Sequence, residues 1–294
     1  MISPTLLLGL CRLSLDGAAL FLWGSGLTLF VLVGEPLRSE LWQRLAGWRR
    51  LLFGLLLTAV LASLPLQASI LGDGWADAWH LDMLAAVANG TSIGTAWWTQ
   101  LVAICLLLLG VTSSDRMRLL ACIAGGGIML TSLALTGHAV MHEGWTGLLH
   151  QANDVLHVWS VGAWIGALPV VLMILSDQYR RTYPDLVSTI FRRFSNIGHA
   201  VVALVFLTGL LNTLLILGRL PLDFHFRYQA LLTMKILVAG AMMAIAVFNR
   251  YVLVPSMRHH RNALRQIRRL TLAEILLSWF ALMLLAWLGM LQPN

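Results

Sequence analysis

Charged residues are scarce in this chain of 294 residues. Asp, Glu, Lys and Arg together make up 11% of the sequence, whereas hydrophobic residues make up 59% and the mean hydropathy is +0.79. A soluble globular domain is usually about a quarter charged, so this chain has too few charges to cover a water-exposed surface. The composition excludes disordered chains, coiled coils, small disulfide scaffolds and soluble nucleic-acid binders, and it predicts an integral membrane protein.

Cysteine is also scarce, and the common nucleotide-binding and hydrolytic motifs are missing. The three cysteines, Cys11, Cys105 and Cys122, lie inside apolar runs and form no CxxC pair. Such residues ordinarily act as small buried hydrophobes, so we expect neither a disulfide framework nor a zinc finger. The chain has no Walker loop, Rossmann glycine pattern, HExxH or GxSxG. An ATP-driven pump is therefore excluded on this chain alone.

Long apolar runs are abundant. A helix that crosses a bilayer needs roughly 20 apolar residues. Eight segments qualify, at about 5–33, 50–71, 97–113, 117–137, 150–176, 194–218, 228–254 and 270–291. We therefore predict an all-α integral membrane protein in contact with membrane lipid, with one transmembrane domain over residues 1–294 built as a bundle of about eight helices. The helical form follows because lipid offers backbone groups no other partners.

The basic residues predict how the bundle is oriented. Most of the 20 Lys and Arg residues lie in the segments 34–50, 116–118, 177–193 and 250–269, which all fall on one side of the predicted spans. Cytoplasmic loops carry an excess of Lys and Arg beside an anionic leaflet. With eight spans, both termini are then expected on the opposite, periplasmic side. This placement accounts for the net charge of +7, and we expect no nucleic-acid partner.

One segment concentrates the ionisable residues, each of which is a candidate for function because it is costly inside a membrane. Residues 137–169 hold, in order, His138, Met141, His142, His150, Asn153, Asp154 and His157. Positions i, i+4 and i+7 share a helix face, so His150, Asp154 and His157 are expected to point the same way. Two imidazoles and a carboxylate suit copper, zinc or iron, and the thioether of Met141 favours Cu(I). Alternatively, these residues only reach headgroups and water.

Two further residues stand out in the later spans. His199, near the start of the sixth span, belongs to a second site or a relay, or else it bonds to a neighbouring helix. Lys235 is the only lysine of the chain and lies deep in the seventh span. An ammonium group there needs a partner, for which Asp154 and Glu274 are the candidates.

The stretch GHAVMHEGWTGLLHQANDVLHVWSVGAWIGALP resembles the CopD family of bacterial copper-resistance membrane proteins. The similarity continues into FRRFSNIGH and LLTMKILVAGAMMAIAVFNR, giving a CopD-like core over residues 137–254. The positions that match the family are His138, His150, His157, His199 and Lys235, with Asn153 and Asp154 alongside, whereas Met141 and His142 are included for their chemistry. The resemblance implies copper handling in the bacterial inner membrane, with a small periplasmic copper-binding partner of the CopC type.

The first span departs from the family pattern. Many members carry a His shortly after the Arg of this span, where the present chain has Leu15-Asp16. A metal ligand from this helix is therefore expected only if Asp16 substitutes for the histidine. Arg12 and Asp16 are four residues apart, and the spacing predicts that they pair.

These observations support three hypotheses about function. The first is copper transport and homeostasis, as import across the inner membrane, with copper captured by His138, His142 and His150 and passed through His157 and Asp154 toward His199. The second is a membrane haem protein or copper-reducing enzyme, in which pairs such as His157 with His199 hold haem b. The third is a docking or sensing component for a periplasmic copper-binding protein. Transport is the leading expectation, and it requires no catalytic residue.

Overall fold

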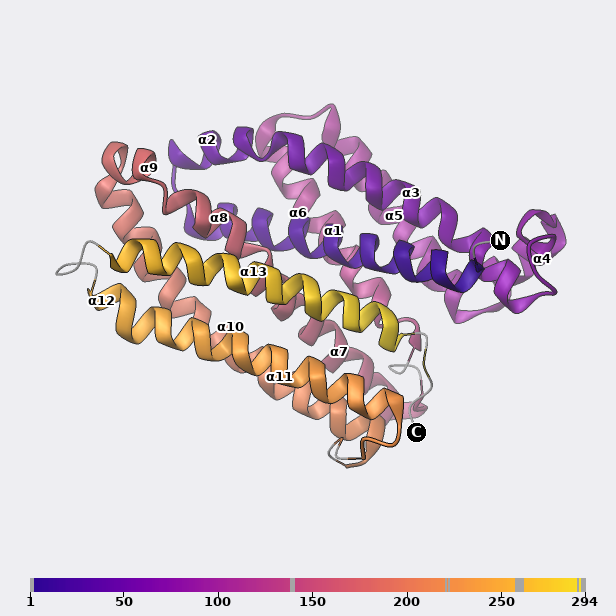
Figure 1. Cartoon of the computed structure of the whole chain (residues 1–294). Helices are drawn as coiled ribbons and strands as arrows, with labels where there is room; N and C mark the ends of the chain where they lie inside the picture. The colour runs from indigo at the N-terminus through magenta and orange to yellow at the C-terminus, as the bar shows by residue number, and fades with distance from the viewer. Residues whose placement is uncertain are drawn as a thin grey trace.

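The protein is described by a computed structural model over residues 3–137, 141–219, 221, 223–256, 262–289 and 291. In this part of the chain every regular element is helical, and eight helical segments are long and apolar enough to cross a membrane. These segments run alongside one another as a single bundle (Figure 1). The predicted all-α fold with eight spans is confirmed.

The spans follow the order expected from the apolar runs. They are α1 (Pro4–Leu32), α3 (Ala46–Leu71), α5 (Ser92–Val111), α6 (Asp115–Leu133), α7 (Gly144–Ile165) continued by α8 (Ala167–Ile174), α10 (Pro184–Leu217), α11 (Arg227–Phe248) continued by η3 (Asn249–Leu253), and α13 (Ala263–Leu288). Shorter helices connect them: α2 (Leu37–Arg44), η1 (Asp77–Trp79), α4 (Leu81–Gly90), α9 (Asp177–Thr182) and α12 (Val254–Ser256).

The arginine-rich connecting segments contain more helix than the apolar runs indicate. The stretch 34–50 holds α2, and the stretch 177–193 contains α9 and the first ten residues of α10. Ser176 at the N-cap of α9 and Pro184 at the start of α10 are residues that favour helix initiation. Both signals are local and polar, and a search for apolar runs passes over them.

Prolines interrupt two of the spans. Proline lacks an N–H group, and its ring crowds the carbonyl four residues earlier. The ring of Pro169 crowds the carbonyl of Ile165, the residue at which α7 ends before α8 begins. Pro255 faces Tyr251 inside the π-helical segment η3 (Asn249–Leu253). Single π-helical turns of this kind are frequent at functional sites.

Helix α1 is the central helix, packed against α3, α6, α7, α8 and α13. It meets α7 backbone to backbone: a Cβ on Gly24 would overlap the carbonyl oxygen of Gly162 and lie 2.7 Å from Cα of Gly166. Beside this contact, Nε1 of Trp23 donates to the carbonyl of Trp159 at 3.0 Å, and the two indole rings are 5.1 Å apart. Small residues allow this close approach of helices in lipid. The contact holds α7 against the centre of the bundle.

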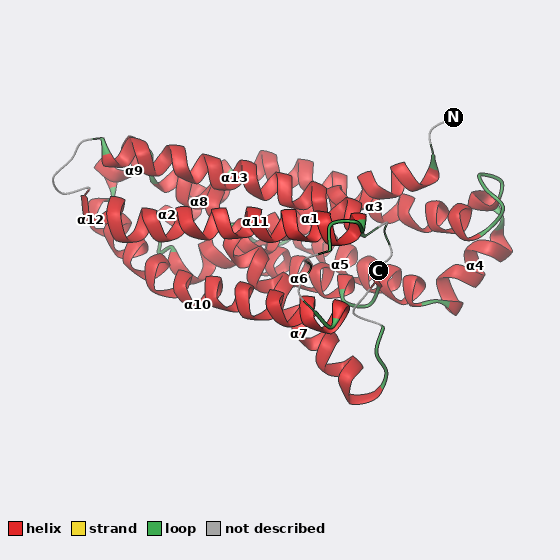
Figure 2. Cartoon of the chain, turned by 60° about the horizontal axis from the view of Figure 1, so that its bottom comes forward, coloured by secondary structure: helices red, strands yellow, loops and turns green. Residues whose placement is uncertain are grey.

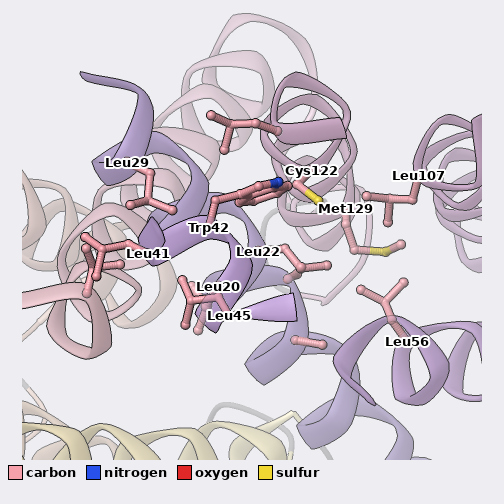
Figure 3. Close-up of a cluster of buried hydrophobic side chains, with 14 of the residues drawn as sticks. Leu20, Leu22, Leu29, Leu41, Trp42, Leu45, Leu56, Leu107, Cys122 and Met129 are labelled. Atoms are coloured by element: carbon pink, nitrogen blue, oxygen red, sulfur yellow. The ribbon is translucent and has the colours of Figure 1, made fainter. Parts of the chain in front are cut away.

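The main apolar core fills the half of the bundle built by α1, α2, α3, α5 and α6. Its buried members include Leu20, Leu22, Leu29, Leu41, Trp42, Leu45, Leu56, Leu107, Cys122 and Met129 (Figure 3). A second, smaller cluster around Trp164 and Met242 joins α7 and α8 to α10, α11 and α13. The three cysteines are free thiols, but only Cys122 is buried as the sequence predicted: Cys11 is half-buried and Cys105 is exposed.

The arginine-rich segments gather at one end of the bundle. Helices α2, α9 and α12 lie at the end opposite to the start of α1 and the end of α13 (Figure 1), and Figure 2 shows α4 far from α9 and α12. Arg44 donates to Oε1 of Gln178 at 2.7 Å, and Gln43 donates to Oδ2 of Asp115 at 2.8 Å. At the other end, Nη1 of Arg12 donates to the carbonyl of Gly289 at 2.6 Å.

We expect Gly24→Ala to destabilise the protein, because the added Cβ overlaps the Gly162 carbonyl. Overpacking of this kind costs typically about 1–3 kcal/mol. In a protein of this size the apparent Tm should then fall by roughly 5 °C. Thermal unfolding of the detergent-purified protein measures the effect. Gly54→Ala is the matched control, because an added Cβ there has nothing within 4 Å; equal melting of the two variants would contradict the prediction.

Candidate functional site

The first turns of α7 and the segment just before it hold a pair of imidazoles. Gly144 begins the helix with φ of +61°, a conformation that favours glycine. A Cβ on Gly147 would overlap the backbone oxygen of His142, so the bare glycine lets the preceding segment fold back over the first turn. Nδ1 of His142 thereby lies 3.2 Å from Nδ1 of His150, whose side chain is only 1% exposed.

The spacing of this pair matches a shared metal ion. Two imidazole nitrogens at about 2.0–2.1 Å from one tetrahedral ion lie about 3.3 Å apart. In this structure the two nitrogens are at hydrogen-bond distance, and within the described residues no set of three His, Cys, Asp or Glu groups surrounds a common point. Met141 is 50% exposed beside His142. His138, the third expected histidine, lies outside the described residues.

Deeper in the membrane, α7 presents three polar side chains to α10. Asn153 donates through Nδ2 to Oδ1 of Asn212 at 2.6 Å and to the carbonyl of Thr208 at 2.9 Å. Asn212 in turn donates through Nδ2 to Oδ1 of Asp154 at 2.9 Å. Nδ1 of His157 lies 2.9 Å from Oγ1 of Thr208. Helices α7 and α10 are thus joined by a continuous chain of interhelical hydrogen bonds.

The threonine defines which nitrogen of His157 is free. The hydroxyl of Thr208 donates its one proton to the carbonyl of Leu204 at 2.5 Å, so toward His157 it acts as an acceptor. Nδ1 of His157 therefore carries the proton, and Nε2 keeps its lone pair for a metal ion. Gly209 makes room for the ring, since a Cβ there would lie 3.1 Å from Cε1 of His157.

Lys235, Asp154 and Asp16 interact electrostatically near the interface of α7 and α10. Lys235 of α11 is half-buried and lies within electrostatic range of Asp154 on α7 and Asp16 on α1. It forms an ion pair with neither carboxylate. Asp16 is 7% exposed, and its Oδ1 has no hydrogen-bond partner among the described residues. Glu274, the other candidate partner of Lys235, instead accepts a hydrogen bond from Nδ2 of Asn249 at 3.4 Å.

The proposed Arg12–Asp16 pair is replaced by another contact. The two side chains interact electrostatically, but the guanidinium hydrogen-bonds to the carbonyl of Gly289 and closes no ion pair with Asp16. The end of α13 offers a carbonyl acceptor at this point because a helix leaves its last carbonyls without partners. The spacing of Arg12 and Asp16 within α1 could not reveal that the end of α13 supplies a competing acceptor for Arg12.

His199 lies apart from the other histidines. Its Nδ1 bonds to the carbonyl of Ser195 at 2.8 Å, and its Nε2 lies 2.8 Å from the hydroxyl of Tyr251 in η3. Thr208, the partner of His157, follows nine residues later on the same helix. At 1.5 Å per residue this is about 13 Å along α10. One ion therefore cannot contact both His157 and His199 in this arrangement.

The sequence pointed to the residues of α7 but not to all of their partners. Thr208 and Tyr251 gave no signal, because hydroxyl side chains are common inside apolar spans. The sequence indicated Asp16 as a partner of Arg12 or as a substitute metal ligand, but not as a neighbour of Lys235. Its proximity to Lys235 depends on how α1, α7 and α11 pack, and no spacing within one helix reveals it.

Fold and site together define a multi-pass helical membrane protein with a histidine- and carboxylate-containing polar site between its spans. Comparison with protein families identifies the family within this class. A family model described as "Copper resistance protein D-like, N-terminal domain" matches residues 1–148, and one described as "Copper resistance protein D" matches residues 188–288. The chain belongs to the copper resistance protein D family.

Individual relatives agree with this assignment. The chain is 34% identical over 258 residues to Copper resistance protein D of Pseudomonas syringae pv. tomato, covering 83% of this chain and 82% of the relative. It is 33% identical to Inner membrane protein YebZ of Escherichia coli strain K12, over 81% of each chain. Copper transport protein CutJ of Bacillus subtilis strain 168 is 30% identical over 70% of this chain and 40% of its own length. No solved structure matches the chain.

We expect Asn212→Leu to destabilise the α7–α10 interface, because Asn153 and Asp154 both lose a partner. Interhelical hydrogen bonds in membranes are worth about 0.6–2 kcal/mol each. The apparent Tm of the purified protein should fall by several degrees, roughly 2–4 °C per kcal/mol. Leu211→Ala, at an exposed neighbouring position, is the control.

A double-mutant cycle gives this prediction a second test. Because Asn153 and Asn212 bond to each other, the change in Tm of the variant that combines Asn153→Leu with Asn212→Leu should be smaller than the sum of the two single changes. Strict additivity would show that the bond between the two amides contributes nothing.

Proposed function

We propose that this protein moves copper across the bacterial inner membrane, from the periplasm toward the cytoplasm. The observation that carries the proposal is the imidazole pair of His142 and His150 at the metal-ligand spacing of 3.2 Å, at the outer end of a helix that carries Asp154 and His157 further in. Membership of a copper-resistance family supplies the identity of the ion. The name of the relative CutJ, a copper transport protein, supports movement of the ion rather than storage.

The arrangement suits an ion that binds and then leaves. His142 and His150 take the ion at the outer end, with His138 and Met141 as further ligands from the adjoining segment. Asp154 and Nε2 of His157 receive it about one and two turns deeper, where Asn153 and Asn212 hold the carboxylate in place. None of the three cysteines lies on α7 or α10: Cys11 is on α1, Cys105 is on α5 and Cys122 is in the apolar core. Conduction requires binding weak enough for release, which imidazole and carboxylate ligands allow.

Two further parts of the proposal concern the inner end and the outer face. His199 lies about 13 Å further along α10 and is the next ligand on the path, reached by a separate step. On the periplasmic side, a small copper-binding protein of the CopC type delivers the ion to the outer histidines. Met141 and Trp145 are exposed and His142 is half-buried, whereas His150 is buried, so the ion enters through His142 and then reaches His150.

A haem-binding redox enzyme is the alternative that the geometry favours less. Two axial histidines must reach one iron from opposite sides. His157 bonds to Thr208 and His199 bonds to Tyr251, about 13 Å apart along α10. His142 and His150 lie in direct ring-edge contact, with ring centroids 5.3 Å apart. A Soret band with stoichiometric iron in the purified protein would decide for the haem protein.

We expect His150→Ala and His157→Ala each to abolish copper-dependent accumulation in cells, because each removes a ligand of the proposed path. Elemental analysis of copper-supplemented cells that carry equal amounts of membrane-inserted protein measures the effect. His80→Ala, an exposed histidine at the start of α4, is the matched control and should accumulate copper like the unmodified protein. Full accumulation by both site variants would rule out this path.

The orientation of the bundle gives a separate prediction. The arginine-rich segments with α2, α9 and α12 are placed in the cytoplasm by the positive-inside rule, so both termini are in the periplasm. A periplasm-dependent reporter such as alkaline phosphatase, fused after Asn294, should therefore be active, and the same reporter inserted between Arg180 and Arg181 should be inactive. The reverse pattern would invert the proposed direction of entry.

A further inference from the structure

We propose that Lys235 is a tethered cation that competes with the copper ion for Asp154, and that Asp16 receives its ammonium group when copper binds. This inference rests on the proposed copper path and adds the mechanism by which that path loads and empties. It concerns two carboxylates on neighbouring helices and the only lysine of the chain, which interacts electrostatically with both.

The packing of α1 and α7 brings the two carboxylates to the same depth. As first and fifth spans, these helices run in the same direction, and they touch where Gly24 meets Gly162. Asp16 precedes Gly24 by eight residues, and Asp154 precedes Gly162 by eight residues. Both carboxylates therefore lie about 12 Å toward the outer end from this contact.

Lys235 interacts electrostatically with both carboxylates. It lies within electrostatic range of Asp154, Asp16 and the ring of His157, yet it closes an ion pair with neither carboxylate among the described residues. A flexible four-carbon stem lets its ammonium group move while α11 stays in place. An ammonium group inside a membrane needs an anionic or polar partner at every stage, so leaving Asp154 requires a second acceptor.

Asp16 has the free capacity to be that acceptor. It is 7% exposed, and its Oδ1 has no hydrogen-bond partner in the described part of the chain. A buried carboxylate oxygen is expected to be satisfied, so an unpaired one indicates a partner that arrives in another state. The other cation that faces it, Arg12, is held by the carbonyl of Gly289. Lys235 is then the mobile cation within reach.

The sequence of states follows from charge repulsion. Without copper, Lys235 is attracted to both Asp154 and Asp16. A copper ion that binds Asp154 and His157 repels the ammonium group, which moves to Asp16. When the ion moves on, Lys235 returns to Asp154, and this return disfavours rebinding of the ion behind it. Lys235 thus weakens copper binding and speeds release. Asp16 draws Lys235 away from Asp154, so it strengthens copper binding and slows release.

This mechanism predicts an effect that a structural role for Lys235 would not produce. Lys235→Met removes the competing charge and keeps an apolar chain of similar length. Copper should bind this variant about tenfold more tightly, because the repulsion is gone. Uptake into proteoliposomes should nevertheless slow by about tenfold, because release becomes limiting. Lys235→Arg keeps the charge and should stay within about threefold of the unmodified protein in both measurements.

The affinity is measured in detergent by competition with a chromogenic copper chelator, using Cu(I) and Cu(II) in separate titrations. Asp16→Asn should change the copper affinity in the opposite direction. Lys235 then stays on Asp154, and copper should bind about tenfold more weakly. Asp82→Asn, an exposed acid on α4, is the control and should bind copper unchanged. Weaker or equal copper binding by Lys235→Met overturns the inference, as does unchanged binding by Asp16→Asn.

The same experiments separate this inference from the proposed function. If the unmodified protein takes up no copper while the two affinity changes appear with opposite signs, transport is refuted and the competition between cations stands. If uptake depends on His150 and His157 but Lys235→Met does not tighten binding, transport stands and the competing role of Lys235 is refuted. Absence of any copper binding by the unmodified protein refutes both.

Discussion

The structure depends on one contact, the backbone-to-backbone approach of α1 and α7 at Gly24 and Gly162. Lipid gives apolar helices little reason to associate with each other rather than with acyl chains, so close packing between small residues must supply the attraction. The indoles of Trp23 and Trp159, which contact each other at a tilt of 35°, add to it on the same side. Since α7 carries the polar site, this contact determines the position of every group that the proposed function uses.

The two halves of the bundle perform different tasks. The apolar core between α1, α3, α5 and α6 contains large aliphatic side chains and provides a rigid support. The polar groups lie on the other side of α7, toward α10 and α11, where Asn153, Asn212 and Thr208 satisfy one another. The bilayer core offers such groups no water as a hydrogen-bond partner, so they lie at helix interfaces where they can bond to one another. This separation keeps the polar groups out of the apolar core.

Much of the architecture could be predicted from the sequence because its signals are local. The eight spans follow from runs of apolar residues, and their number is confirmed. The candidate face of α7 followed from the spacing of His150, Asp154 and His157, since an α-helix repeats every 3.6 residues. The helices α9 and the start of α10 escaped detection because their sequence is polar and charged.

The sequence by itself determined that the chain is a membrane bundle and that His150, Asp154 and His157 share one helix, because hydrophobicity and helical periodicity act over a few turns. Only the tertiary structure decided their partners. The return of His142 onto His150 depends on Gly147, the free nitrogen of His157 depends on Thr208, and the approach of Lys235 to Asp16 depends on three helices at once. The reason is physical: these contacts join residues far apart in the chain, and the packing of whole helices sets their distances.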